Sequence, residues 1–195
     1  MFRELRASLS LFIILALITG FAYPMLVMGV GQKLFPSQAN GSLIRNDQGK
    51  IIGSALIGQS FSNAIYFHPR PSVAGNGYDA TQSSGSNLAP TSPDLINAVR
   101  DRSSVLKKND SLVAIPVDLV TASGSGLDPD ISPAAAKLEA AQVAEARHMD
   151  LVRVQDLITQ HTTARTWGFL GDNRVNVLEL NRALDQITPP TAPSH

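Results

Sequence analysis

The sequence contains no cysteine, which excludes disulfide bonds, cysteine-ligated zinc and a thiol nucleophile. It also lacks an excess of either charge, because 16 lysine and arginine residues balance 16 aspartate and glutamate residues. A neutral, sparsely charged chain offers no electrostatic surface for nucleic acid, so we expect no nucleic-acid partner. Charge is missing altogether from residues 9–31, and this local absence indicates the first structural element.

Residues 9–31 form an uncharged and predominantly apolar run. As a helix rising about 1.5 Å per residue it would extend roughly 35 Å, enough for a hydrocarbon core of roughly 30 Å. A cleaved signal peptide is the alternative, because Arg3 and Arg6 precede the run and residues 20–22 resemble a cleavage site. The run continues well past residue 22, which favours an uncleaved transmembrane helix in contact with membrane lipid.

The short segment before the run is typical of an anchor whose N-terminus stays in the cytoplasm. We therefore expect residues 1–8 to form a cytoplasmic tail and residues 32–188 to form a domain outside the cytoplasm. Positive charge decides little here, since Lys33 and Arg45 follow the span. The proline-rich residues 189–195 are predicted to be a disordered tail.

The region after the span is long enough for one domain with its own core. Apolar runs at 42–44 and 50–52 predict a hairpin, with the second strand continuing through residues 54–57. Residues 67–90 are rich in proline, glycine, serine and asparagine, which predicts a long irregular loop of the kind that often carries function. Helices are predicted at 92–108, from Pro133, after Asp150 and at 177–187, with extended segments at 112–120 and 174–175. The mixture predicts an α+β fold.

Residues 121–132, T-A-S-G-S-G-L-D-P-D-I-S, have the appearance of a phosphate-binding loop before a helix. They lack the lysine of a P-loop and the third glycine of a dinucleotide loop, and Asp128 and Asp130 would repel phosphate. We interpret the segment as a structural or partner-facing turn. An S-x-x-K match at residues 104–107 lacks the companion motifs of its enzyme class. We therefore expect no catalytic residue, no metal site and no cofactor bound by this chain.

Small residues in the span and polar residues in the loops are the candidates for partner contacts. In the span they permit a kink and the close approach of another helix, although a lipid-facing anchor with incidental glycines fits equally well. The stretch F-H-P-R-P-S could present two polar side chains to a partner or could only fix a loop. The candidate partner-binding residues are Gly20, Pro24, Gly29, His68, Arg70, Ser86, Asn87, Asp118, Thr121, Ser123, Gly126 and Asp128.

Four long and irregular stretches, at 58–72, 84–95, 115–133 and 175–185, together resemble one known family. With the N-terminal span and the P-S-Q-A-N-G-S-L-I of residues 36–44, the chain resembles the KdpC family. These are the small C subunits of bacterial Kdp potassium-transporting P-type ATPases. The resemblance covers nearly the whole chain except its proline-rich tail.

The resemblance implies a non-catalytic accessory subunit of a high-affinity, ATP-driven potassium uptake complex in the bacterial inner membrane, with the main domain in the periplasm. Its implied partners are a channel-like potassium-binding subunit, an ATP-hydrolysing P-type subunit and a small single-span subunit. ATP, Mg²⁺ and K⁺ would be handled by the complex. The family's C subunit is needed for assembly and is described as a catalytic chaperone that raises the ATP affinity of the ATP-hydrolysing subunit. A periplasmic domain cannot touch cytoplasmic ATP, so such an effect would be indirect. The alternatives are an independent membrane-anchored periplasmic enzyme and an ATP-binding subunit of inverted topology.

Overall fold

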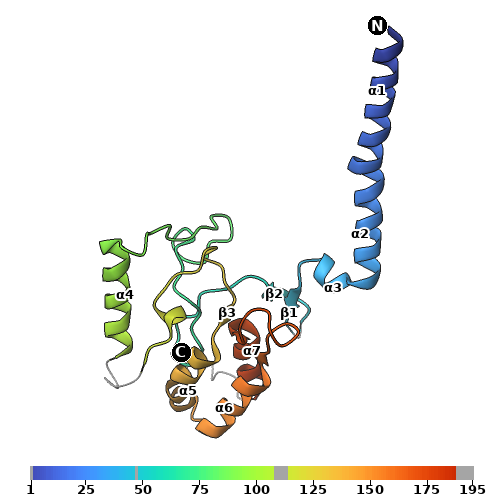
Figure 1. Ribbon diagram of the computed structural model, residues 1–195. Helices are drawn as coiled ribbons and strands as arrows, with labels where there is room; N and C mark the ends of the chain where they lie inside the picture. Colours follow the sequence, from blue (N-terminus) through green and yellow to red (C-terminus); the bar gives the residue numbers. More distant parts are fainter. Residues whose placement is uncertain (1, 47, 108–113, 188–195) are drawn as a thin grey trace. The chain divides into compact units, whose positions relative to one another are not determined.

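The computed structural model describes residues 2–46, 48–107 and 114–187, and the chain divides into two compact units (Figure 1). The first unit comprises residues 1–54 and the second comprises residues 55–195. Each unit is described by itself below.

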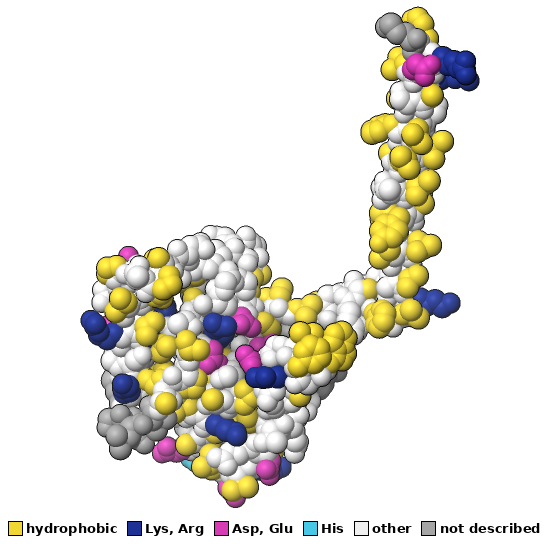
Figure 2. Space-filling view, in the orientation of Figure 1, with side chains coloured by type: hydrophobic (Ala, Val, Ile, Leu, Met, Phe, Trp, Pro, Cys, Tyr) yellow, Lys and Arg dark blue, Asp and Glu magenta, His cyan; other side chains and the backbone are white. Residues whose placement is uncertain are grey.

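The first unit is dominated by one long apolar helix, built from α1 (Phe2–Leu17), the π-helical turn η1 (Ile18–Ala22) and α2 (Tyr23–Leu34). At about 1.5 Å per residue its 33 residues extend roughly 50 Å, so the helix is long and apolar enough to cross a membrane. None of its most apolar window is buried. Figure 2 shows hydrophobic side chains along its length and basic side chains at both ends. The predicted span, residues 9–31, lies inside this helix, which extends beyond it in both directions.

The helix changes its hydrogen-bond pattern at the point where Gly20 and Pro24 predict an irregularity. Pro24 has no N–H to donate to the carbonyl of Gly20, and its ring crowds that carbonyl. The chain responds with a π-helical turn, in which the N–H of Tyr23 reaches the carbonyl of Ile18. Such turns accommodate a break in the regular ladder without ending the helix.

After the helix, a short turn α3 (Pro36–Ala39) leads into an antiparallel hairpin of β1 (Leu43–Arg45) and β2 (Ile51–Ser54). The side chain of Asn46 holds its turn by accepting the backbone N–H of Lys50 at 2.9 Å. The predicted hairpin is therefore confirmed, but the second strand ends at Ser54 and does not continue to Ile57.

The second unit has a core of three helices packed on a small antiparallel sheet with strand order β3-β5-β4 (Figure 1). These elements are β3 (Asp130–Ile131), α5 (Pro133–Ala146), α6 (Leu151–Gln160), β4 (Thr162–Thr163), β5 (Arg174–Asn176) and α7 (Val177–Ile187). The sequence predicts the helices and the segment around β5. It does not predict β3 and β4, because strands of two residues are too short to show an alternating pattern.

Capping side chains fix the starts of α5 and α6. The side chain of Ser132 accepts the N–H of Ala135 at 3.0 Å at the start of α5, and that of Asp150 accepts the N–H of Val152 at 2.9 Å at the start of α6. Each bond satisfies a donor that has no partner within its helix. Both helices turn apolar residues toward the core, since α6 buries Val154, Leu157 and Ile158, and α7 buries Leu180 and Leu184, with Ile187 partly buried beside them.

The helix α4 (Pro93–Leu106) lies where it is predicted but differs from the core helices, because it buries none of its residues. Ser92 precedes it in an extended conformation, and its side chain forms no capping hydrogen bond. One polar tie is the bond from Arg102 Nη1 to the carbonyl of Val120, at 2.8 Å. The prediction of an extended segment at 112–120 is wrong for its described part, because Val117–Leu119 form the 3-10 turn η2. Residues 112 and 113 lie outside the described residues.

Candidate partner-docking surface

Two irregular segments of the second unit run beside each other, and we refer to residues 58–90 and 120–129 as the paired loops. No helix or strand of the described chain falls within either segment. The prediction of a long irregular loop at 67–90 is therefore confirmed. Loops of this length require specific contacts if they are to hold one conformation.

The paired loops approach each other closely at two glycines. The N–H of Gly58 donates to the carbonyl of Leu127 at 2.8 Å, and Ser72 Oγ donates to the carbonyl of Gly126 at 2.6 Å. Gly126 has a φ of +67°, and a Cβ at this position would lie 2.6 Å from the carbonyl oxygen of Ser84. Both the backbone conformation and the close approach exclude a larger residue. Gly126 is therefore a structural residue of the paired loops.

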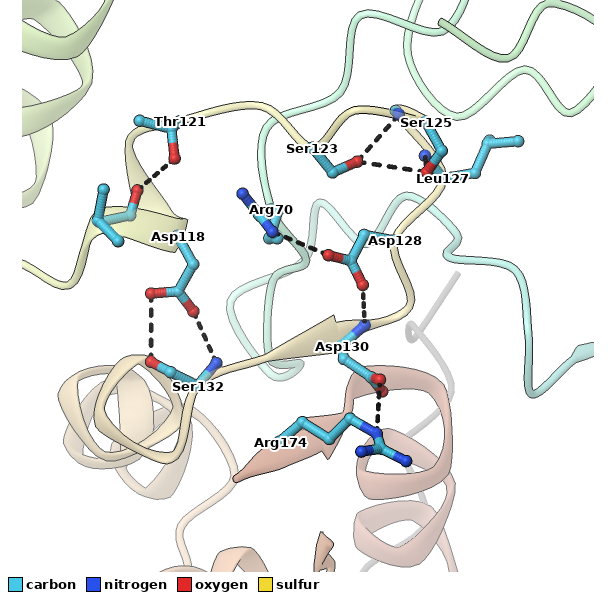
Figure 3. Close-up of polar contacts among 12 residues, drawn as sticks. Arg70, Asp118, Thr121, Ser123, Ser125, Leu127, Asp128, Asp130, Ser132 and Arg174 are labelled. Atoms are coloured by element: carbon cyan, nitrogen blue, oxygen red, sulfur yellow. Dashed lines mark hydrogen bonds and ion pairs between the residues drawn. The ribbon is translucent and has the colours of Figure 1, made fainter. Parts of the chain in front are cut away.

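Figure 3 shows the ionic contacts that hold the second of the paired loops. Arg70 Nη1 lies 2.9 Å from Asp128 Oδ2, which links the two loops, and Asp128 Oδ1 accepts the N–H of Asp130 at 3.1 Å. Asp130 Oδ2 in turn lies 3.2 Å from Arg174 Nε at the start of β5. Burial, with a smaller contribution from the charge of Asp128, raises the pKa of Asp130.

The segment that has the appearance of a phosphate-binding loop uses its own side chains to satisfy its backbone (Figure 3). The N–H of Gly126 donates to the buried Oγ of Ser123 at 2.9 Å, and the N–H of Leu127 donates to Ser125 Oγ at 3.1 Å. A phosphate cradle needs such amides to point at the ligand. The geometry is that of a serine-stabilised turn.

Two further candidates fix the approach to α5. Asp118 accepts the N–H of Ser132 at 2.6 Å and its hydroxyl at 3.2 Å, so it positions the residue that caps the helix. Thr121 Oγ1 donates to the carbonyl of Val117 at 2.7 Å and closes the turn η2. Both side chains are occupied by contacts within the domain (Figure 3).

His68 is held by a carboxylate on the inner face of α5. Glu139 Oε2 accepts the backbone N–H of His68 at 2.9 Å and lies 2.9 Å from its ring Nδ1. The Glu139 side chain is only 10% exposed, on a helix face otherwise lined by buried alanine and valine. The hydrogen bond with this carboxylate raises the pKa of His68.

The adjacent Phe67 anchors the loop in the core. Its side chain is fully buried, and its backbone is gripped at two points by the buried side chain of Asn181 on α7. Phe67 N–H donates to Asn181 Oδ1 at 2.9 Å, and Asn181 Nδ2 donates to the carbonyl of Phe67 at 3.0 Å. The amide thus satisfies a buried backbone donor and acceptor that have no strand beside them.

A third anchor lies at the end of α5. Arg147 Nε donates to the carbonyl of Ile65 at 2.6 Å, and its Nη2 lies 2.6 Å from Asp185 Oδ1 on α7. The guanidinium group also lies 4.9 Å from the ring centroid of Tyr66, whose hydroxyl donates to Asp185 Oδ2 at 3.1 Å. Burial and the neighbouring Asp185 carboxylate raise the pKa of Tyr66. These contacts clamp the start of the loop between two helices.

Sequence reasoning missed these three anchors. The residues are Tyr66, Glu139, Arg147, Asn181 and Asp185. One signal was present, because Asn181 falls on the same helical face as Leu180 and Leu184, and a polar residue at an inward position needs an internal partner. Nothing in the sequence indicates that this partner is the backbone of Phe67.

The remaining candidates make no such contacts. Ser86 and Asn87 are exposed, and their side chains form no hydrogen bond with another described residue. Gly20, Pro24 and Gly29 lie exposed on the long helix, with open space around both glycines. The structure therefore divides the candidates into side chains that hold the loops in place and side chains that face outward from their units.

Within the described residues, no group of three or more histidine, aspartate and glutamate side chains could hold a metal ion. Ser104 of the S-x-x-K match donates to the carbonyl of Asp101 at 2.7 Å. Together, these features define a class of protein in which an N-terminal helix long and apolar enough to cross a membrane is followed by a mixed α/β domain with anchored loops.

Comparisons with known proteins assign the family. The sequence model of the KdpC family, described as the c chain of the K⁺-transporting ATPase, matches residues 5–186, so the chain belongs to this family. It is 53% identical over 188 residues to a Mycobacterium bovis protein called potassium-transporting ATPase KdpC subunit, covering 95% of this chain and 99% of the relative. Proteins of the same name from Acidobacterium capsulatum and Gemmatimonas aurantiaca are each 54% identical, over 94% and 100% of this chain and 98% of each relative. The resemblance inferred from the irregular sequence stretches is confirmed.

Proposed function

We propose that this chain is a non-catalytic accessory subunit of a high-affinity, ATP-driven potassium uptake complex of the bacterial inner membrane. Family membership supports this assignment, as does the name that the relatives carry. In this proposal the helix Phe2–Leu34 crosses the membrane with its N-terminus in the cytoplasm, and the domain that follows is periplasmic. Its partners are a channel-like potassium-binding subunit, an ATP-hydrolysing P-type subunit and a small single-span subunit.

The observation that carries the proposal is the anchoring of the paired loops. Asn181, Glu139 and Arg147 hold the first loop against the core helices, so its exposed part is already ordered before any partner binds. Binding by an ordered loop avoids most of the entropy cost of fixing a flexible one. The first loop is long, irregular and held in one conformation, and it leaves Ser86 and Asn87 exposed to solvent. Such a loop is suited to contact another subunit.

We infer that any effect of this chain on ATP binding is indirect. The amides of residues 126 and 127 are bonded within their own turn, which leaves them unsuited to hold a phosphate. A subunit that raises the ATP affinity of another subunit does so by favouring one of its conformations. Linkage then requires ATP to tighten the binding of this chain to the complex by the same factor, typically about 5- to 150-fold for coupled sites.

The test compares outward-facing residues with residues that hold the loop. The double variant Ser86→Lys and Asn87→Gly places a charge in the proposed contact and keeps a residue that tolerates the φ of +52° at position 87. We expect its melting temperature to equal that of the parent chain. Recovery of the assembled complex and growth on limiting potassium should both fall, because the new charge would be desolvated without a partner.

Two further variants serve as controls. Gln155→Lys adds the same charge to an exposed position of α6 and should leave melting, assembly and growth unchanged. His68→Ala with Arg70→Ala removes contacts that hold the loops, so it should lower the melting temperature as well as growth. Normal assembly and growth with the Ser86 and Asn87 double variant would contradict docking through this surface.

A further inference from the structure

The loop between β4 and β5 carries an exposed group of large apolar side chains, which Figure 2 shows as a compact hydrophobic cluster. We call residues 166–170 the aromatic tip. Trp167 is 81% exposed, Phe169 is 69% exposed and Leu170 is 47% exposed. The rings of Trp167 and Phe169 lie beside each other with centroids 6.4 Å apart. None of these side chains contributes to the core, so their exposure needs a reason outside the fold.

The aromatic tip is a tight and well-defined turn. Thr166 and Leu170 exchange two backbone hydrogen bonds, of 2.9 and 3.0 Å, and an ion pair of 2.7 Å between Arg165 and Asp172 closes its base. Trp167 has a φ of +53°, a conformation that is unfavourable for a bulky side chain. Backbone strain that supports no buried contact often marks a residue held for binding.

We propose that the aromatic tip inserts into the interfacial region of the same membrane that the chain's own helix crosses. Tryptophan favours this region, where its apolar ring meets the acyl chains and the indole N–H stays hydrated. Phenylalanine and leucine supply apolar area on the inserted side of interfacial segments. The tip contains no charged residue between Arg165 and Asp172, so its insertion takes no charged side chain out of water.

The dimensions of the tip favour lipid over a protein partner. A stable protein interface takes roughly 20–30 residues a side, whereas the tip is an exposed turn of five residues, followed by the exposed Gly171. Insertion into a bilayer requires no complementary surface, and two aromatic rings supply useful apolar area.

Because the chain is already attached to the membrane by its helix, the aromatic tip needs only a weak affinity for lipid to stay inserted. Leu34 ends the long helix and the second unit begins at residue 55, so residues 35–54 are the chain that joins the helix to the second unit. A domain tethered to a membrane by a linker of this length meets the membrane at a high effective concentration. The helix would then provide the anchor and the tip a second, orienting contact.

Trp167 is the single tryptophan of the chain, which allows a direct test. The full-length chain is placed in nanodiscs, and tryptophan fluorescence is measured with lipids brominated on their acyl chains and with iodide in the water. We expect bromine to quench Trp167 and iodide to quench it little. The matched control combines Trp167→Phe with Gln155→Trp, which moves the probe to an exposed position of α6. Iodide should quench this control and bromine should not.

A second variant tests the apolar contribution. Phe169→Ser should leave melting unchanged, because the ring is mostly exposed, and should lower the ratio of inserted to water-facing tip about tenfold, equivalent to ~1.4 kcal/mol. The proposal is overturned if iodide quenches Trp167 as strongly as it quenches the control. It is also overturned if neither reagent reaches Trp167, since the tip would then be covered by protein.

Discussion

Replacing Asn181 by leucine would test whether the core anchors the loop that we propose as a docking element. The substitution keeps an aliphatic side chain of similar size on α7 but removes both hydrogen bonds to Phe67, of 2.9 and 3.0 Å. A buried donor and a buried acceptor are then left without partners, at a cost of about 1–3 kcal/mol each, or about 2–6 kcal/mol together. The second unit spans residues 55–195, and for a domain of this size about 2 kcal/mol corresponds to a loss of at least roughly 6 °C in melting temperature.

The assay is thermal unfolding of the full-length chain in detergent, followed by circular dichroism. The matched control is Asn97→Leu, because Asn97 is an exposed asparagine in the middle of the helix α4. We expect little change for the control and a large loss for Asn181→Leu, together with poorer growth on limiting potassium because the loop is no longer held. Equal melting of the two variants would refute the reasoning, since the Phe67 backbone would then not depend on Asn181.

Two further predictions concern protonation and the long helix. The hydrogen bond with Glu139 raises the pKa of His68 above its ordinary value of about 6.5. The protonated His68 therefore contributes its full stabilisation below that pH, and this stabilisation is lost as the pH rises through the higher pKa of the folded state. The contribution of His68 to the free energy of unfolding should therefore fall on going from mildly acidic to alkaline pH, by no more than about 1 kcal/mol because the ring is partly exposed. Glu139→Gln should flatten this dependence. An unchanged slope in that variant would argue against the contact between His68 and Glu139. Gly20→Leu and Gly29→Leu should leave the isolated chain helical, since both positions are open, yet weaken recovery of the complex in detergent by blocking close helix contact. Val27→Leu is the control. Normal recovery of the complex with both glycine variants would contradict a specific helix contact and leave the helix with an anchoring role alone.

Some parts of this protein follow from short stretches of its sequence. The uncharged run at 9–31 predicts the long helix, because a chain without charge over that length is compatible with a membrane. Ser132 and Asp150 predict the starts of α5 and α6, since a capping side chain acts on amides two or three residues away. The spacing of the apolar residues of α7 predicts its buried face. The irregular motifs also identify the family, which the comparisons confirm.

The roles of the candidate residues depended on the tertiary structure. His68 and Arg70 have the features of outward-facing contacts in the sequence, but their partners Glu139 and Asp128 lie 71 and 58 residues further along the chain. Asn181 reaches across 114 residues to Phe67. Caps and helical faces are determined by neighbours within about four residues, which the sequence displays directly. The partner of a buried polar side chain is determined by which distant segments the core brings together, and only the folded chain shows that arrangement.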